Sequence, residues 1–192
     1  MVPWLPAKSA LPFALLAPTT TILLIGLRGS GKTTVARLLA KRLNREAIDL
    51  DELTPTYLGE KTAGDALRHR GEPAFRRAEL AALIHALKTP GRVIALGGGT
   101  PTAPGVAELL ESGRKQNSLI IIYLRASAET LRARLAAEAH TDRPTLTGQG
   151  TLEEIGVLLN LRDTLYKSLA TLVLAVDQNT PEVVTDRIAS NS

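Results

Sequence analysis

The stretch TILLIGLRGSGKTT, residues 21–34, decides the fold of this chain of 192 residues. Its first half, Thr21–Leu27, is a continuous apolar run, which is typical of a strand buried on both faces of a parallel sheet. Gly29 to Gly31 break this run. Helical periodicity follows over residues 33–43, with an apolar face formed by Val35, Leu38, Leu39 and Leu43. A buried strand, a glycine turn and an amphipathic helix in series predict the opening unit of an α/β fold.

The turn itself, GLRGSGKTT at residues 26–34, matches the phosphate-binding pattern G-x-x-x-x-G-K-[ST] in full. Glycines let successive backbone N–H groups turn inward around phosphate oxygens, and the positive end of the following helix points at the same phosphates. In this pattern the lysine reaches the β- and γ-phosphates of ATP, and the next hydroxyl ligates Mg²⁺. We therefore predict nucleotide contacts from Gly29, Ser30, Gly31, Lys32, Thr33 and Thr34, with Mg²⁺ on Thr33.

Four further apolar runs alternate with helical stretches along the rest of the chain. This alternation predicts a parallel sheet flanked by helices. The expected strands are Ala47–Leu50, Val93–Leu96, Leu119–Leu124 and Thr171–Val176. The expected helices are Thr62–Leu87 with a break at Gly71 and a restart at Pro73, Val106–Ser112, Ala128–Ala137, Leu152–Leu169, and a last one that begins near Pro181.

Composition narrows the class of protein. Hydrophobic residues make up 44% and charged residues 22%, which is ordinary for a globular chain, and the lack of cysteine excludes disulfides and thiolate metal sites. The net charge is +4, but basic and acidic residues are interleaved and aromatic residues amount to only 3%, so we expect no nucleic-acid partner. No run approaches the roughly 20 apolar residues of a membrane span. We expect a cytoplasmic monomer without a membrane partner.

The first eighteen residues, MVPWLPAKSALPFALLAP, follow neither the helical nor the strand periodicity. Lys8 and the apolar stretch Ala10–Ala17 faintly resemble a short signal sequence, although the prolines and the thin basic start speak against that interpretation. We expect residues 1–18 to be a poorly ordered extension and residues 19–192 to form one domain.

Two carboxylates stand near the end of the second expected strand, in IDLDE at residues 48–52. Residues two apart on a strand point the same way, so Asp49 and Asp51 would face one site. The carboxyl ends of parallel strands border the ligand crevice. One acid would then hold the Mg²⁺ shell while the other contacts an acceptor hydroxyl. Alternatively, Asp51 caps the following helix.

Two later segments carry arginines suited to an acidic substrate. GEPAFRR, residues 71–77, contains Arg76 and Arg77, and a guanidinium can grip a carboxylate through two parallel hydrogen bonds. At least one of the two must be an ordinary solvated arginine. RDTLY, residues 162–166, offers Arg162 as a second clamp or as an exposed helix arginine that pairs with a neighbouring acid.

Two loops complete the candidate site. LGGGTP, residues 96–101, ends a strand with three glycines, which indicates either backbone close to a ligand or an ordinary turn. The segment His140–Thr151 has no apolar period and contains Arg143 beside Pro144. A mobile loop with such an arginine could close over ATP and stabilise developing charge.

In series, these features resemble the shikimate kinase family, over about Thr21–Ile188. The resemblance implies a five-stranded parallel sheet in the order 2-3-1-4-5, of the P-loop nucleoside monophosphate kinase type. Substrate-binding helices would span about residues 52–88 and a lid about residues 138–151. The implied reaction transfers the γ-phosphate of ATP to the 3-hydroxyl of shikimate, giving shikimate 3-phosphate and ADP, in aromatic amino-acid biosynthesis.

On the acceptor side, the resemblance implies that Asp51 contacts the shikimate hydroxyls and is the candidate base. Arg76 and Arg162 would clamp the shikimate carboxylate. Glu79 falls where the family carries an acid that orients the substrate arginine. The pocket lining would include Gly97, Gly98 and Gly99.

On the nucleotide side, the resemblance implies Asp49 near Mg²⁺ through water, Arg143 reaching ATP from the lid, and Arg132 beside the adenine. Lys32, Asp51 and Arg143 would be the catalytic residues. Two segments depart from the family pattern: Pro55 stands where the family runs an uninterrupted helix, and the lid differs in length from many relatives.

Two other functions fit parts of the pattern. A related small-molecule kinase such as gluconate kinase shares the fold and the phosphate loop, but it would not require the GGG loop together with Arg76 and Arg162. A non-catalytic, shikimate-kinase-like sensing domain is the second. Such a domain should accompany a helix-turn-helix segment, which the first eighteen residues cannot supply. Degraded catalytic positions would also support it, but the catalytic candidates are all present: Lys32, Thr33, Asp49, Asp51 and Arg143.

Overall fold

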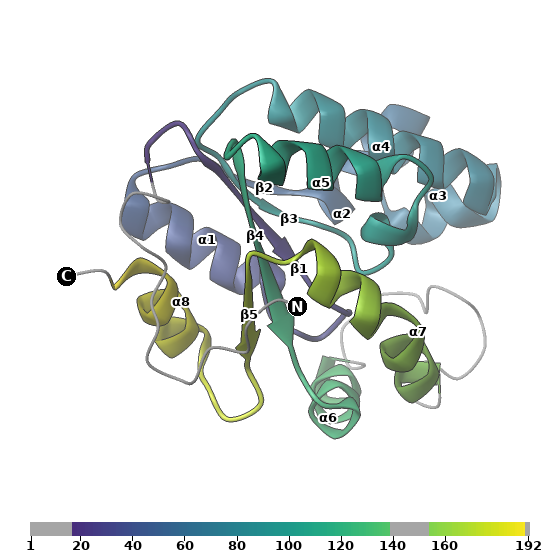
Figure 1. Ribbon diagram of the computed structural model, residues 1–192. Coiled ribbons are helices and arrows are strands. Elements are labelled where there is room, and N and C mark those ends of the chain that lie inside the picture. The colour runs from purple at the N-terminus through teal and green to yellow at the C-terminus, as the bar shows by residue number, and fades with distance from the viewer. Residues whose placement is uncertain (1–16, 139–153, 191–192) are drawn as a thin grey trace.

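The computed structural model describes residues 17–138 and 154–190. Its centre is one five-stranded parallel sheet in the order β2-β3-β1-β4-β5, which confirms the order that the resemblance implied (Figure 1). The strands are β1 (Thr21–Ile25), β2 (Ala47–Asp49), β3 (Val93–Ala95), β4 (Leu119–Arg125) and β5 (Leu172–Ala175).

The central strand β1 is fully buried, as its continuous apolar run predicts. Its Ile22 pairs with Val93 on one side and with Ile120 on the other. The edge strands β2 and β5 are only partly buried, because each has a neighbour on one side alone. The phosphate-binding sequence therefore follows the best-anchored strand of the sheet.

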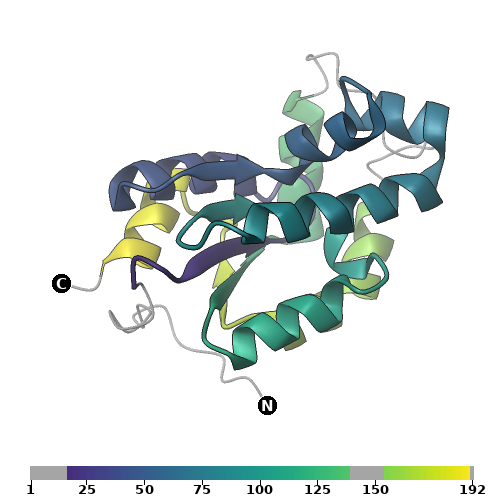
Figure 2. The same cartoon turned by 90° about the horizontal axis from the view of Figure 1, so that it is seen from above.

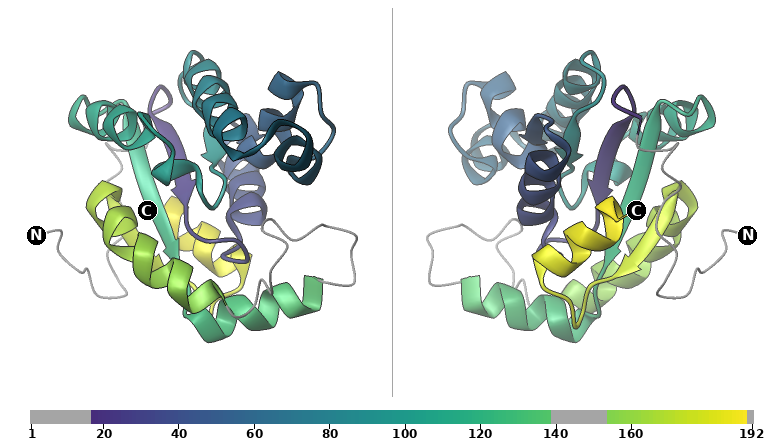
Figure 3. Two further views of the ribbon diagram at one scale, coloured as in Figure 1. Left: turned by 90° about the vertical axis from the view of Figure 1, so that its right-hand side faces the viewer. Right: turned by 90° about the vertical axis from the view of Figure 1, so that its left-hand side faces the viewer.

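Helices cover both faces of the sheet. Figure 3 shows α1 (Lys32–Leu43) and α8 (Pro181–Ala189) on one face, and α5 (Val106–Lys115) and α7 (Glu154–Leu169) on the other. The helix α6 (Ala128–Glu138) packs against α7. None of the helices in the described ranges combines the length and the apolar character that a membrane span requires.

A lobe of three short helical segments and one long helix, residues 50–87, gathers at one side of the molecule (Figure 2). It consists of α2 (Leu50–Leu53), the 3₁₀ helix η2 (Thr54–Leu58), α3 (Ala63–Arg70) and α4 (Glu72–Leu87), which pack on one another. We call it the α2–α4 lobe. Its helices break at Gly71, whose φ of 78° suits glycine, and Pro73 stands in the first turn of α4. Pro55 stands in the first turn of η2.

Strand ends differ slightly from the prediction. The strand expected at 47–50 ends at Asp49, because Leu50 already begins α2, and β1 ends at Ile25, before the first glycine of the phosphate loop. At the start of the described chain, the Arg45 guanidinium donates to the carbonyls of Ala17 and Thr20 at 3.0 and 2.9 Å. The expectations for residues 1–16, and for the lid over most of its length, lie outside the described residues.

Candidate active site

The phosphate loop leads from β1 into α1 through Gly29 and Gly31, both in the left-handed conformation with φ of 82° and 88°. Gly31 is the N-cap residue of α1, and neither a side-chain cap nor an acid occupies the first turn of this helix. Its positive end is therefore open to an anion. The buried hydroxyl of Ser30 has no hydrogen-bond partner among the described residues, which leaves a donor inside the same loop.

Lys32 lies folded across this loop. Its side chain is buried, and its Nζ donates to the Leu27 carbonyl at 2.9 Å. A buried ammonium beside the open positive end of α1 gives this loop a positive character, which suits a polyphosphate. Thr34 follows in the first turn of α1, where its side chain is exposed.

Thr33 and Asp49, both predicted to serve Mg²⁺, meet in the structure. The Thr33 hydroxyl donates to Asp49 Oδ2 at 2.6 Å, while Asp49 Oδ1 accepts from the Asp51 backbone N–H at 2.9 Å. Asp49 is thus the N-cap of α2, so the alternative that gave this capping role to Asp51 is wrong. A hydroxyl and a carboxylate oxygen side by side are the ligand types that Mg²⁺ prefers, with phosphates and water completing its shell.

In the GGG loop, Gly97–Gly99, three polar groups surround Gly97. A β-carbon at this position would lie 2.6 Å from Asp51 Oδ1, 2.8 Å from Thr100 Oγ1 and 3.0 Å from Glu79 Oε1. Glycine here lets the Asp51 carboxylate approach the loop. Glu79 is only 2% exposed, and its Oε1 accepts from the Thr100 hydroxyl at 2.6 Å. Asp51 and Glu79 therefore meet at one end of the GGG loop, although Asp51 is exposed and Glu79 is buried.

Arg76 lies against the same loop. Its Nη1 donates to Glu79 Oε2 at 2.7 Å, and its Nε and Nη2 donate to Glu72 Oε1 at 3.2 and 3.0 Å. A β-carbon at Gly99 would lie 2.6 Å from Arg76 Nη1. Burial lowers the pKa of Arg76, but the hydrogen bonds and charges of Glu79 and Glu72 outweigh it and raise the pKa above its usual value. Arg77 is exposed, as expected for the solvated member of the pair.

Arg162 reaches the middle of the loop from α7. Its Nη1 donates to the Gly98 carbonyl at 2.9 Å, and the Tyr166 hydroxyl donates to the same oxygen. A β-carbon at Gly98 would lie 3.1 Å from the backbone nitrogen of Arg28, so the GGG loop packs on the phosphate loop. The two predicted arginine clamps thus meet neighbouring glycines of one loop, and this loop abuts the phosphate loop.

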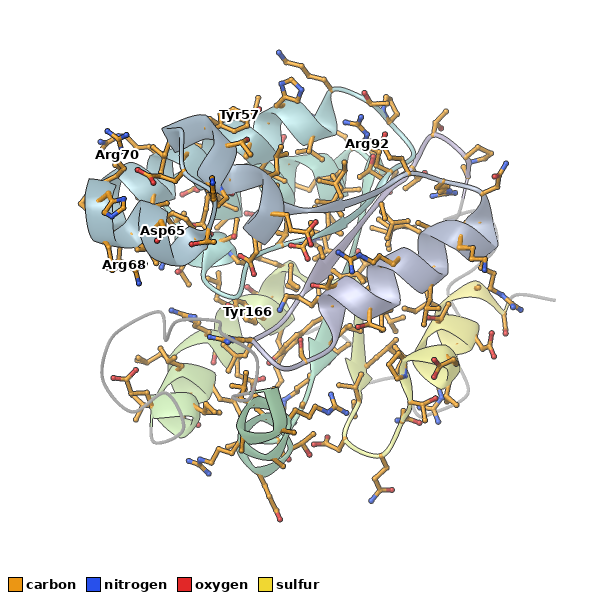
Figure 4. The ribbon with its side chains drawn as sticks, turned by 180° about the vertical axis from the view of Figure 1, so that it is seen from behind. Tyr57, Asp65, Arg68, Arg70, Arg92 and Tyr166 are labelled. Atoms are coloured by element: carbon orange, nitrogen blue, oxygen red, sulfur yellow. The ribbon has the colours of Figure 1, made fainter. Side chains whose placement is uncertain are left out.

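No sequence signal singled out a role for Tyr166, although it stands four residues after Arg162, on the same helix face. Tyr166 is fully buried, and burial raises its pKa to about 12, so the hydroxyl keeps its proton for the Gly98 carbonyl. Figure 4 shows Tyr166 near the middle of the molecule, whereas Asp65, Arg68 and Arg70 lie at the far end of the α2–α4 lobe.

A cavity of about 300 Å³ opens beside the phosphate loop. Arg134 forms part of its wall, donating to the Gly29 carbonyl at 3.3 Å and to the Val176 carbonyl at 2.8 Å. The other lining residues are Gly29, Ser30, Gly31, Val35, Ala137, Val176, Asn179, Pro181 and Val184. Apolar walls with a few polar groups suit a flat base such as adenine.

Arg132, predicted beside the adenine, is not among these lining residues. It is exposed, and a β-carbon at Gly156 of α7 would lie 3.2 Å from its Nη2. Residues two apart on a helix point about 200° apart, which is why Arg134 faces the cavity while Arg132 faces α7. The role of Arg132 stays a prediction, and so does that of Arg143, which lies outside the described residues.

The family model of shikimate kinase matches residues 28–191. Shikimate kinase 2 of Dickeya chrysanthemi is 39% identical over 170 residues, covering 86% of this chain and 92% of the relative. The shikimate kinase of Rhodopirellula baltica is 37% identical over 168 residues, covering 85% of this chain and 86% of the relative.

Solved structures point the same way. A shikimate kinase from Acinetobacter baumannii in complex with shikimate has a TM-score of 0.78 at 28% identity, covering 92% of this chain and 94% of that chain. A gluconokinase from Sinorhizobium meliloti has a TM-score of 0.55 at 19% identity, covering 90% and 91%. The second likeness shows the fold alone.

Proposed function

This chain belongs to the shikimate kinase family, and on that premise we propose that it transfers the γ-phosphate of ATP to the 3-hydroxyl of shikimate, releasing ADP and shikimate 3-phosphate. This reaction belongs to aromatic amino-acid biosynthesis. One observation carries the proposal. Arg76 and Arg162 meet a glycine loop that abuts the phosphate loop, so a carboxylate-bearing acceptor bound there lies next to the nucleotide.

The nucleotide binds along the phosphate loop. Backbone N–H groups from Gly29 to Thr34 surround the β- and γ-phosphates, and Lys32 moves from the Leu27 carbonyl onto the phosphate oxygens. The adenine occupies the cavity beside the loop, with Arg134 in its wall. Arg143 supplies a further positive charge to ATP from the lid segment. This charge stabilises the negative charge that the transition state spreads over the oxygens of the transferred group.

Thr33 and Asp49 would hold Mg²⁺, and the family resemblance implies that Asp49 would do so through water. Their 2.6 Å hydrogen bond supports this proposal because it brings the two oxygens together, and the carboxylate adds the negative charge that a hard cation favours. When bound, Mg²⁺ neutralises charge on the β- and γ-phosphate oxygens.

The acceptor lies between Asp51 and the two arginines. Asp51 accepts a hydrogen bond from the attacking hydroxyl and takes its proton as the oxygen–phosphorus bond forms. Arg76 and Arg162 bind the carboxylate, and Glu79 holds Arg76 in place from the buried side.

We propose that the protein is a cytoplasmic monomer. Its partners are ATP and shikimate, and it binds neither nucleic acid nor membrane. The absence of cysteine fits a reducing compartment.

The sensing-domain alternative is not favoured, because the matching family model and the curated relatives are shikimate kinases, and Lys32, Thr33, Asp49 and Asp51 are all present in the chain. The gluconokinase alternative rests on a fold likeness at 19% identity, which carries no substrate.

The deciding experiment measures ADP release from magnesium-ATP in a coupled assay, with shikimate, with gluconate and with no acceptor. We expect release that depends on shikimate, with shikimate 3-phosphate identified by mass spectrometry. Release that depends on gluconate alone would contradict the proposal. So would silence with every acceptor despite tight ATP binding, which would favour a sensing domain.

A further inference from the structure

The helix α7 is fixed to the sheet by a carboxylate that the proposed mechanism does not use. Asp163 follows Arg162 directly, yet it faces β4. Its Oδ1 accepts from the Tyr123 hydroxyl at 2.9 Å and from Arg125 Nε at 2.8 Å, and its Oδ2 pairs with Lys167 Nζ at 2.6 Å. Tyr123 and Arg125 belong to β4, so two of the three bonds join the helix to the sheet.

Tyr123 connects Asp163 with the residues around the GGG loop. Its ring meets the ring of Tyr166 edge to face, with centroids 5.3 Å apart and planes at 85°. Both rings are almost completely buried. The Tyr166 hydroxyl in turn reaches the Gly98 carbonyl, which Arg162 also binds. A continuous set of contacts therefore runs from Arg125 through Asp163 and the two tyrosines to the GGG loop.

The geometry of a helix explains what Asp163 contributes. Arg162 and Tyr166, four residues apart, lie on one face, while Asp163 lies about 100° around the axis from Arg162. Contacts on two faces fix the rotation of a helix about its axis, whereas contacts on a single face leave it free to roll. If α7 rolled, the 2.9 Å bond from Arg162 Nη1 to the Gly98 carbonyl would lengthen and break.

The Asp163 carboxylate is suited to this task. Its side chain is 17% exposed, so water screens its ion pairs less than it screens those of the outer surface. Burial raises the pKa of Asp163, but the hydrogen bonds from Lys167, Arg125 and Tyr123 outweigh burial and bring the pKa below its usual value. The group is therefore a carboxylate at neutral pH, and its charge holds the two basic partners.

We propose that Asp163 is a positioning residue for the acceptor: by binding Tyr123 and Arg125 of β4 it fixes the rotation of α7, so that Arg162 and Tyr166 meet the Gly98 carbonyl. This inference rests on the proposed function, because it takes Arg162 as a clamp for the acceptor carboxylate. Asp163 touches no substrate, and its effect reaches the reaction through Arg162.

The test is steady-state kinetics on Asp163→Asn and Arg125→Met, with both substrates varied. Asparagine keeps the size of the side chain and can still accept from Tyr123, but it loses the charge that holds Arg125. We expect the KM for shikimate to rise about tenfold in each variant, as a misplaced binding group would cause, while the KM for ATP stays within about twofold.

Lys167→Met is the matched control. It removes the other basic partner of the same carboxylate, but Lys167 stands one turn along the same helix and makes no link to β4 in this ion pair. We expect both KM values of Lys167→Met to match the wild type. Tyr123→Phe keeps the ring contact with Tyr166 and loses only the hydroxyl bond, so it supplies a second test if Asp163→Asn does not fold.

An unchanged KM for shikimate in Asp163→Asn and Arg125→Met would overturn the inference. An equal rise of both KM values would do so as well, since it would indicate a general loss of structure. If Asp163→Asn does not fold, an unchanged KM for shikimate in Tyr123→Phe and Arg125→Met overturns it. A wild-type enzyme without shikimate-dependent ADP release would refute the proposed function, and this inference with it.

Discussion

Two glycine loops end neighbouring strands of the sheet, the phosphate loop after β1 and the GGG loop, Gly97–Gly99, after β3. In the proposed function the phosphate loop supplies its own functional groups, namely its backbone N–H groups and the side chains of Lys32 and Thr33. The GGG loop has no side chains of its own to contribute. The side chains around it come from α2, α4 and α7, which lie far apart in the sequence.

The glycines also serve different purposes in the two loops. Gly29 and Gly31 have φ values of 82° and 88°, which side-chain-bearing residues rarely adopt. In the GGG loop the limit is space. A β-carbon at Gly97 or at Gly99 would lie 2.6 Å from a polar atom of Asp51 or of Arg76. One loop needs glycine for its backbone shape, and the other needs it to admit side chains from elsewhere.

The largest expected effect on turnover comes from a substitution on the nucleotide side of the site. Lys32→Ala should lower kcat by roughly 10³–10⁵-fold, because cations on the transferred phosphoryl group contribute on that scale. The circular dichroism spectrum should stay that of the wild type. Normal turnover in this variant would contradict the assignment of the phosphate loop. Lys41→Ala, near the exposed end of the same helix, is the matched control and should leave kcat unchanged.

Asp51→Asn tests the reacting end of the acceptor side. We expect kcat to fall by roughly 10²–10⁴-fold if the carboxylate takes the proton of the attacking hydroxyl. A rise in the KM for shikimate at unchanged kcat would instead limit Asp51 to binding.

Gly97→Ala sharpens the contrast between the two loops. The new methyl group would collide with Asp51, Thr100 and Glu79, so we expect kcat/KM for shikimate to fall about 10²-fold through displacement of these groups. The KM for ATP should change little. If both substrates lost affinity equally, the two loops would not be separable, and the comparison would fail.

Arg134→Ala and Arg132→Ala form a pair that tests the nucleotide cavity. Arg134 lies in the cavity wall and Arg132 faces α7. We expect the KM for ATP to rise about tenfold in Arg134→Ala, the loss of one hydrogen-bonding charged group, and to stay near the wild-type value in Arg132→Ala. The reverse result would restore the adenine role predicted for Arg132.

The sequence predicted the sheet well because buried parallel strands read as continuous apolar runs, and strand ends differ by two residues at most from expectation. It also predicted the phosphate loop, whose groups are contiguous. The roles of Tyr166 and Arg134 were not predicted, because they depend on which face of a helix contacts which loop. No local pattern distinguishes Arg132 from Arg134 before the helix is placed against the cavity.

The capping of α2 shows the same limit. Asp49 and Asp51 stand two residues apart at the end of the expected strand, and either carboxylate could accept from a backbone N–H at the start of the next helix. Asp49 became the cap because β2 ends one residue earlier than expected. The same carboxylate then accepts from the Thr33 hydroxyl, so the cap and the residue proposed to bind Mg²⁺ through water are one and the same.

The most direct test of a separate acceptor side is calorimetric titration of shikimate into the nucleotide-free protein, wild type and Arg76→Ala. The account predicts that the wild type binds shikimate and that Arg76→Ala weakens this binding by about 10–100-fold, as expected for the loss of a charged pair, with ATP binding unchanged. Unchanged shikimate binding, or an equal loss of ATP binding, would contradict the account.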